Sequence, residues 1–87
     1  MINSMTTTDV IIDVLDQHGR LRVKAISLRD DDSLYGAGLT SHACVNVMLA
    51  LEDAFDVEFP EQLLKRSTFE TIGNLESAVR PLLVPES

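Results

Sequence analysis

Apolar residues recur at helical spacing in several stretches of this sequence, which predicts an all-α fold. The first helix is expected over about Thr8 to His18, with threonine caps and Asp9 at its start and Gly19 at its end. The second helix is expected over Ser41 to Phe55. Its predicted core face comprises Cys44, Val47, Met48, Leu51 and Phe55.

A short third helix is expected to start at Phe59 to Glu61, with proline at its first position. Leu63 and Leu64 are predicted to supply its apolar contacts, and Lys65 and Arg66 to complement the negative charge at its end. The predicted fold is therefore a small four-helix bundle with three longer helices and one short helix.

The last helix is expected after a capping box at Ser67 to Glu70. Gly73 is predicted to weaken this helix, and Pro81 to end or distort it near Arg80. The whole chain, 1–87, is expected to be a single domain with a core over about 8–82 and frayed ends. The predicted buried stripe of the last helix consists of Ile72, Leu75, Val79 and Leu82.

Residues 20–38 show no sustained periodicity and are predicted to form a long loop with short helical turns. Asp30 to Asp32 is an acidic run without the alternating ligands, glycine and later glutamate of a calcium-binding loop. A solvated loop is therefore favoured and no metal site is predicted. The apolar residues expected to hold this loop on the core are Leu21, Val23, Ile26, Leu28 and Leu34.

Two apolar residues of the second helix fall outside its predicted core face. They are Val45 and Leu49, and Leu49 is predicted to lie nearly opposite the core face. Carboxylates surround the pair, so the sequence predicts a docking surface for a partner protein. The predicted docking residues are Val45, Leu49, Glu52, Asp53 and Asp56.

The composition excludes several classes of function. The chain has 87 residues and a net charge of -7, with 14 acidic and 7 basic residues, which argues against binding nucleic acid. Its one cysteine excludes an internal disulfide, and no apolar run reaches the ~18 residues of a membrane span. The segment Met1 to Met5 does not resemble a signal peptide. We therefore expect a cytoplasmic protein.

The stretch Gly36 to Ser41 contains the strongest chemical signal. Two glycines lead into Thr40 and Ser41, either of which can cap the second helix. A phosphodiester built on Ser41 would be stabilised by unpaired backbone N–H groups and by the helix dipole. The alternative is that Ser41 is only a cap.

Two segments, Asp32 to Ser41 and Leu51 to Pro60, resemble the signatures of phosphopantetheine carrier proteins, and the resemblance extends from about Thr8 to Leu82. It implies a four-helix bundle whose serine, Ser41 by position, receives 4′-phosphopantetheine from coenzyme A through a separate transferase. The thiol of the arm would carry an acyl group as a thioester between enzymes, with no catalysis by the carrier. The flanking site residues implied are Gly38, Leu39, Thr40 and His42.

The sequence departs from the pattern of fatty-acid carriers. Thr40 and His42 replace the usual aspartate and leucine beside the serine, and Ala43 and Asn46 stand where many of those carriers have acids. The chain looks closer to stand-alone carriers that accept amino acids from ATP-dependent ligases, some of which resemble aminoacyl-tRNA synthetases. We therefore hypothesise an aminoacyl carrier that is loaded by such a ligase and serves a downstream acceptor enzyme.

Three alternatives remain open. A fatty-acyl or polyketide-type carrier would share the modified serine, and a cavity that sequesters a long acyl chain would favour it. A helical adaptor would use the docking surface without any modification. An enzyme is disfavoured because adjacent residues such as Ser41 and His42 point about 100° apart on a helix and form no nucleophile–base pair.

Overall fold

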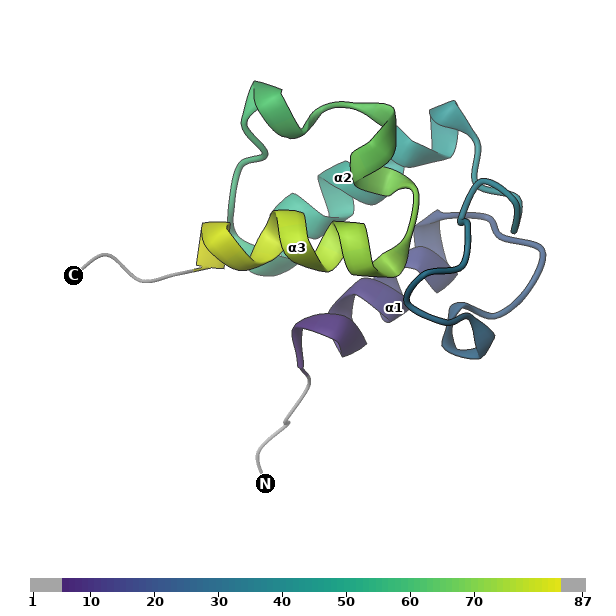
Figure 1. Cartoon of the computed structure of the whole chain (residues 1–87). Coiled ribbons are helices and arrows are strands. Elements are labelled where there is room, and N and C mark those ends of the chain that lie inside the picture. Colours follow the sequence, from purple (N-terminus) through teal and green to yellow (C-terminus); the bar gives the residue numbers. More distant parts are fainter. Residues whose placement is uncertain (1–5, 84–87) are drawn as a thin grey trace.

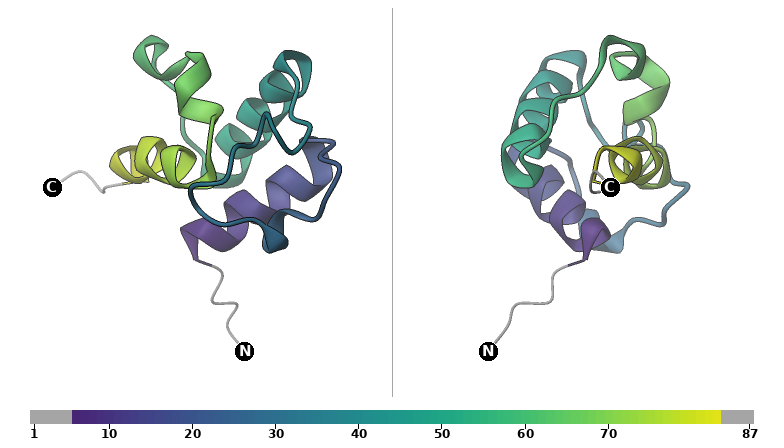
Figure 2. Two further views of the ribbon diagram at one scale, coloured as in Figure 1. Left: turned by 45° about the vertical axis from the view of Figure 1, so that its right-hand side comes forward. Right: turned by 90° about the vertical axis from the view of Figure 1, so that its left-hand side faces the viewer.

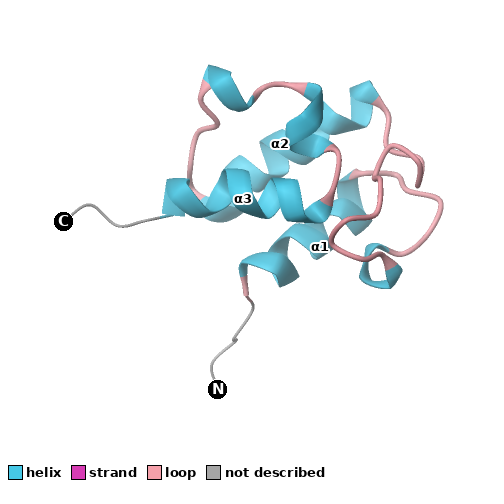
Figure 3. Ribbon diagram, in the orientation of Figure 1, coloured by secondary structure: helices cyan, strands magenta, loops and turns pink. Residues whose placement is uncertain are grey.

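Three α-helices form the framework of the protein in a computed structural model that describes residues 6–83: α1 (Thr7–His18), α2 (Ser41–Phe55) and α3 (Ile72–Leu83) (Figure 1). α1 packs against both α2 and α3. The right view of Figure 2 shows α1 and α2 on one side of the molecule and α3 on the other. Residues 6–83 contain no strand, so the all-α prediction is confirmed (Figure 3).

The apolar stripes of the three helices meet in one core. On α2, Val47 and Leu51 are fully buried as predicted, whereas Cys44, Met48 and Phe55 pack only partly buried against the core. The core side chains are Ile11, Val14, Leu15, Ala25, Leu34, Leu39, Ala43, Val47, Leu51, Phe59, Phe69, Ile72, Leu75 and Val79.

α1 begins one residue earlier than predicted because Thr6 caps it. The Thr6 hydroxyl accepts a hydrogen bond from the backbone N–H of Asp9, and the Asp9 carboxylate accepts one from the N–H of Thr6. Each bond satisfies a backbone donor that the first turn leaves free. At the other end, the N–H of Gly19 donates to the Leu15 carbonyl at 2.8 Å.

The long loop between α1 and α2 contains one 3₁₀ turn, η1 (Ala25–Ser27). Leu34 is fully buried as expected, but Val23 and Ile26 are exposed, Ile26 by 67%, so their predicted packing is wrong. Ala25 is buried instead, and its N–H donates to the Asp16 carboxylate at 2.7 Å. The backbone path of a loop, not a side-chain period, determines which of its residues face the core. The other two expected contacts, Leu21 and Leu28, are partly buried.

The predicted short helix after α2 differs from the structure. This segment forms two 3₁₀ turns, η2 (Glu61–Leu63) and η3 (Arg66–Phe69), so residues 6–83 contain three α-helices and no fourth. Leu63 is partly buried, but Leu64 is 49% exposed. The rings of Phe59 and Phe69 stack with centroids 6.2 Å apart. This stacking and the burial of both rings anchor the two ends of the segment to the core.

α3 starts and ends later than predicted. The expected capping box at Ser67 to Glu70 is wrong, because these residues belong to the end of η3: the N–H of Glu70 donates to the Ser67 carbonyl. Thr68 and Phe69 between them are buried. Thr71 caps instead, its hydroxyl accepting from the N–H of Asn74 at 2.9 Å. The helix also continues through Pro81, since the two leucines that follow pack partly buried against the core. The predicted stripe is otherwise confirmed: Ile72, Leu75 and Val79 are buried and Leu82 is partly buried.

Gly73 has a role that the helix pattern did not suggest. Its N–H donates to the Asp30 carbonyl at 2.9 Å, and a Cβ at this position would lie 3.2 Å from the same oxygen. The absence of a side chain therefore lets the long loop approach α3. None of the described helices has the length and hydropathy of a membrane-spanning helix. The expected frayed ends and the segment Met1 to Met5 lie outside the described residues.

Candidate functional site

The turn before α2 positions its first residues at the surface. Leu34 and Leu39 are buried on either side of the turn, and the N–H of Leu39 donates to the Leu34 carbonyl at 3.0 Å. Gly38 has φ +117°, a conformation that residues with side chains rarely adopt. A Cβ on Gly38 would also lie 3.3 Å from Arg22. The buried Leu39 thus anchors the chain immediately before it emerges at residue 40.

Thr40 and Ser41 divide the two roles that the sequence left open. The Thr40 hydroxyl accepts from the N–H of Ala43 at 3.0 Å and is the N-cap of α2. Ser41 is the first helical residue, it is exposed, and its hydroxyl takes part in no hydrogen bond within residues 6–83. The alternative in which Ser41 is the cap of this helix is therefore wrong. Its oxygen is accessible for covalent attachment.

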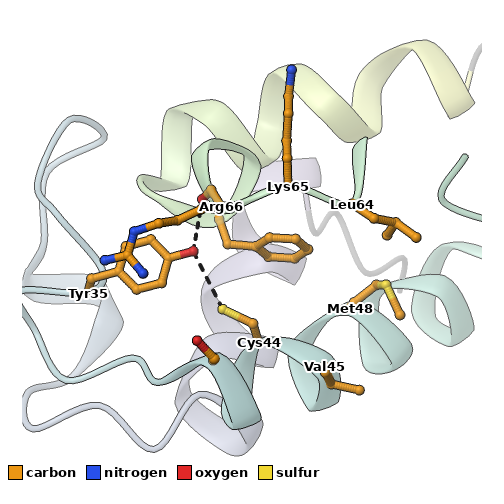
Figure 4. A pocket seen from close by; sticks show the side chains of 9 residues that line it. Tyr35, Cys44, Val45, Met48, Leu64, Lys65 and Arg66 are labelled. Atoms are coloured by element: carbon orange, nitrogen blue, oxygen red, sulfur yellow. Dashed lines mark hydrogen bonds between the residues drawn. The ribbon is translucent and has the colours of Figure 1, made fainter. Parts of the chain in front are cut away.

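Ser41 borders a pocket of about 420 Å³ between α2 and the two 3₁₀ turns η2 and η3 (Figure 4). Because its walls are mostly apolar and it opens to solvent beside the serine, it can accommodate an extended, flexible group attached there. The residues that line it are Tyr35, Ser41, Cys44, Val45, Met48, Leu64, Lys65, Arg66 and Phe69. Ser41 and this pocket together fit a group the size of a phosphopantetheine arm.

One end of this pocket is formed by the side chain of Tyr35. Its hydroxyl donates to the backbone carbonyl of Arg66 at 2.8 Å and lies 3.7 Å from the sulfur of Cys44 (Figure 4). The Arg66 guanidinium carbon is 3.8 Å from the centre of the Tyr35 ring. Burial, followed by the neighbouring Cys44, raises the pKa of Tyr35 to about 12. The phenol therefore stays protonated and keeps its bond to Arg66.

His42 follows Ser41 on α2 and is exposed. Within the part of the chain that the structure describes, no hydrogen bond joins its ring to Ser41, and no group of three His, Cys, Asp or Glu side chains is arranged to hold a metal ion. The site therefore offers an accessible hydroxyl oxygen that is not hydrogen-bonded to a base within the described residues.

The predicted docking residues lie on two faces. Val45 and Leu49 are each 52% exposed. Val45 lines the pocket beside Ser41, whereas Leu49 and Asp53 line a separate depression between α1 and α2. Glu52 is half-buried, and its carboxylate accepts from the N–H of Phe59 at 2.7 Å. Glu52 thus holds the chain after α2 and differs from the free rim carboxylate expected there.

The remaining docking candidate is Asp56. It is exposed and adopts a left-handed backbone conformation, φ 57°, as the C-cap of α2. Its N–H donates to the Glu52 carbonyl, which ends the helix.

Most of the pocket wall was not predicted from the sequence. Arg66 was expected only to complement the end of a short helix, and Tyr35 was assigned no role. The two residues are 31 positions apart, and no periodicity relates a loop to a 3₁₀ turn. Cys44 and Met48 were predicted on the core face and are partly buried. The helix pattern could have suggested this for Met48, which lies at the edge of the predicted core face, but not for Cys44, which lies near the middle of it.

Residues 18–79 match the family described as phosphopantetheine attachment site. The chain is 41% identical over 73 residues to the aminoacyl carrier protein of Agrobacterium fabrum strain C58. The match covers 84% of this chain and 88% of that protein.

Two solved structures are also similar to this chain. One is a crystal structure of an engineered Bradyrhizobium japonicum glycine:[carrier protein] ligase complexed with a carrier protein from Agrobacterium tumefaciens and ATP. A chain in it has 38% identity and a TM-score of 0.84, covering 87% of this chain and 99% of that chain. The other is a crystal structure of the Bradyrhizobium japonicum glycine:[carrier protein] ligase complexed with glycylated carrier protein. A chain in it has 28% identity and a TM-score of 0.70, and the match covers 83% of this chain and 96% of that chain.

Proposed function

Because the chain belongs to the phosphopantetheine attachment site family, we propose that it carries an amino acid as a thioester on a 4′-phosphopantetheine arm attached to Ser41. The observation that supports this most directly is the exposed Ser41 hydroxyl, free of hydrogen bonds in the described residues, at the first position of α2. The 41% identity to an aminoacyl carrier protein supports the class of cargo.

The residues around Ser41 suit a phosphodiester. Thr40 holds the start of α2 rigid, and the partial positive charge of the helix N-terminus favours an anion on the adjacent oxygen. Buried Leu39 and the left-handed Gly38 fix the direction in which Ser41 leaves the core. The arm supplies the thiol on which the acyl group is carried. The protein then needs no catalytic base, and we propose that it is not itself an enzyme.

The proposed partners act in sequence on Ser41 and the arm attached to it. A phosphopantetheinyl transferase attaches the arm, an ATP-dependent amino acid ligase loads it, and a downstream acceptor enzyme receives the cargo. Relatives have been captured with glycine ligases, so glycine is the first amino acid to test. The exposed Val45, Leu49, Asp53 and Asp56 are proposed as docking residues, with His42 beside the attachment site. We propose that these events take place in the cytoplasm.

Intact-mass measurement tests this proposal directly. The protein is coexpressed with a broad-specificity transferase, purified, and incubated with ATP, glycine and a glycine:[carrier protein] ligase. We expect a mass gain of one phosphopantetheine and then of one glycyl group. Ser41→Ala should gain neither, while Ser77→Ala, which removes another exposed serine hydroxyl, should gain both. No arm on the wild type with any transferase would refute the proposal and favour an unmodified adaptor.

A fatty-acyl carrier is a second candidate, because the pocket beside Ser41 has apolar walls and about 420 Å³ of space. The two candidates differ in cargo. Holo-protein offered equal amounts of glycine with its ligase and of a fatty acid with an acyl-carrier ligase should be glycylated faster. Fatty acylation alone would support the second candidate.

A further inference from the structure

Arg66 is exposed, and its guanidinium has no carboxylate partner among residues 6–83. Its guanidinium forms no ion pair and no hydrogen bond within residues 6–83, where the one ion pair joins Arg80 and Glu76. Arginine carries five N–H donors in a planar fork, and these donors usually bind carboxylate or phosphate. Six of the seven Lys and Arg residues form no ion pair within residues 6–83, so what distinguishes Arg66 is its place over the Tyr35 ring at the pocket beside Ser41.

This free guanidinium is nevertheless held in a defined place. It lies over the Tyr35 ring at 3.8 Å, and the Tyr35 hydroxyl binds the backbone carbonyl of the same arginine at 2.8 Å. Two contacts to one aromatic residue restrict both ends of the arginine, so less conformational entropy is lost when its donors bind a ligand. Figure 4 shows the head of Arg66 above the ring at the end of the pocket.

The position of Arg66 relates it to Ser41. Both residues line the same pocket. The Tyr35 hydroxyl is also 3.7 Å from the sulfur of Cys44, which follows Ser41 by one helical turn and so lies on the same side of α2. The chain of contacts Arg66–Tyr35–Cys44 therefore places the guanidinium on the side of α2 from which the Ser41 oxygen projects.

We propose that Arg66, oriented by Tyr35, binds the phosphodiester of the arm on Ser41. This inference rests on the proposed function and assigns a positioning residue to the same site. A phosphodiester carries one negative charge at its attachment point, and arginine binds phosphate oxygens through two parallel N–H donors. The contact fixes the first bonds of the arm along the pocket side of α2. The distal thiol stays free to reach partner enzymes.

Lys65 provides a matched comparison, because it has the same charge, is adjacent in sequence and lines the same pocket. Its ammonium group extends away from Tyr35, whereas the Arg66 head lies over the Tyr35 ring (Figure 4). A general attraction between positive charge and phosphate would involve both residues about equally. A specific contact would involve Arg66 alone.

The test uses the holo-protein and three variants: Arg66→Gln, Arg66→Lys and Lys65→Gln. Intact mass first shows whether each carries one arm. We then expect the ³¹P resonance of the phosphodiester to shift in Arg66→Gln, to shift less in Arg66→Lys, and to stay at the wild-type position in Lys65→Gln. Added salt should move the wild-type resonance toward that of Arg66→Gln.

A second measurement needs no change at Arg66. The ¹⁵N–H resonance of the Arg66 Nε should shift when the arm is attached, and Ser41→Ala treated with the same transferase should show no shift. If every protein carries the arm but neither resonance responds, or if both glutamine variants respond equally, the Arg66 contact is refuted and the proposed function stands. If the wild type never acquires the arm, both fail.

Discussion

At the residue scale, Thr40 and Ser41 show how two adjacent hydroxyls acquire different roles. Thr40 has extended backbone angles, so its hydroxyl turns back to the free N–H of Ala43. Ser41 is the first helical residue, and its hydroxyl makes no hydrogen bond within residues 6–83. The sequence predicted that one of the pair caps and that the serine is modified, and the local backbone assigned the cap to Thr40.

This division predicts that two alanine variants differ in their effect on stability. Thr40→Ala should lower the free energy of unfolding by about 1 kcal/mol, because α2 loses its cap. Ser41→Ala should change it by less than about 0.5 kcal/mol, because the exposed hydroxyl holds nothing in place. Urea denaturation of the apo-proteins measures both, with Thr40→Ser as the variant that retains the cap. A larger loss in Ser41→Ala than in Thr40→Ala would contradict the assignment.

At the scale of one element, α2 has to serve the core and the surface at once. Leu51 is fully buried, while Leu49, two positions away, is 52% exposed. Two positions on a helix differ by about 200° in direction, so the two leucines point to opposite sides. The helical pattern predicted this contrast correctly. It did not show that Val45 and Leu49 open onto different depressions, because that depends on the neighbouring α1 and 3₁₀ turns.

We therefore expect matched leucine variants to separate folding from docking. Leu51→Ala should cost about 2–5 kcal/mol of unfolding free energy, because it leaves a cavity in the core. Leu49→Ala should cost less than about 0.5 kcal/mol, and Leu49→Glu should keep the helical circular dichroism of the wild type. Leu49→Glu should also weaken binding of the loading ligase, measured by calorimetry. Unfolding of Leu49→Glu would refute the exposed position of this residue.

At the scale of the whole molecule, a side-chain contact ties the first helix to the last. The Thr8 hydroxyl on α1 donates to the Glu76 carboxylate on α3 at 2.5 Å, across 68 positions of sequence. Arg80 donates to the same carboxylate at 2.7 Å. The hydrogen bond from Thr8, supported by Arg80, lowers the pKa of Glu76 from its ordinary value of 4.5, and partial burial opposes this shift.

A lowered pKa makes part of the stability dependent on pH. The ionised Glu76 stabilises the fold above its ordinary pKa, and this contribution is lost as the pH falls through the lower pKa of the folded state. The unfolding free energy of the wild type should therefore fall more between about pH 6 and about pH 3 than that of Glu76→Gln. Thr8→Val removes the hydrogen bond to Glu76, so the unfolding free energy of this variant should also fall less with decreasing pH than that of the wild type. Denaturant titrations at several pH values measure it.

The exposed carboxylate Glu61, which forms no side-chain hydrogen bond in the described residues, supplies the control. Glu61→Gln should retain the pH dependence of the wild type. Equal pH profiles for the wild type and Glu76→Gln would show that the ionisation of Glu76 contributes nothing to stability.

The sequence by itself determined the features that depend on near neighbours. The spans of α1 and α2, the buried stripe of α3 and the candidate serine all follow from helical periodicity, capping residues and a local motif. The residues that carry these signals lie within a few positions of the feature that they predict, because a helical hydrogen bond joins positions only four apart. The family resemblance rests on the same kind of local pattern.

Only the tertiary structure decided the features that join distant segments. Gly73 lets the loop at Asp30 approach α3, the segment between the stacked Phe59 and Phe69 forms two 3₁₀ turns in place of a short helix, and Tyr35 holds Arg66 beside the Ser41 pocket. None of these follows from a local period, because each depends on where the chain returns after an irregular segment. The packing of the core sets that path, and burial there outweighs the weak local preferences of loops and turns.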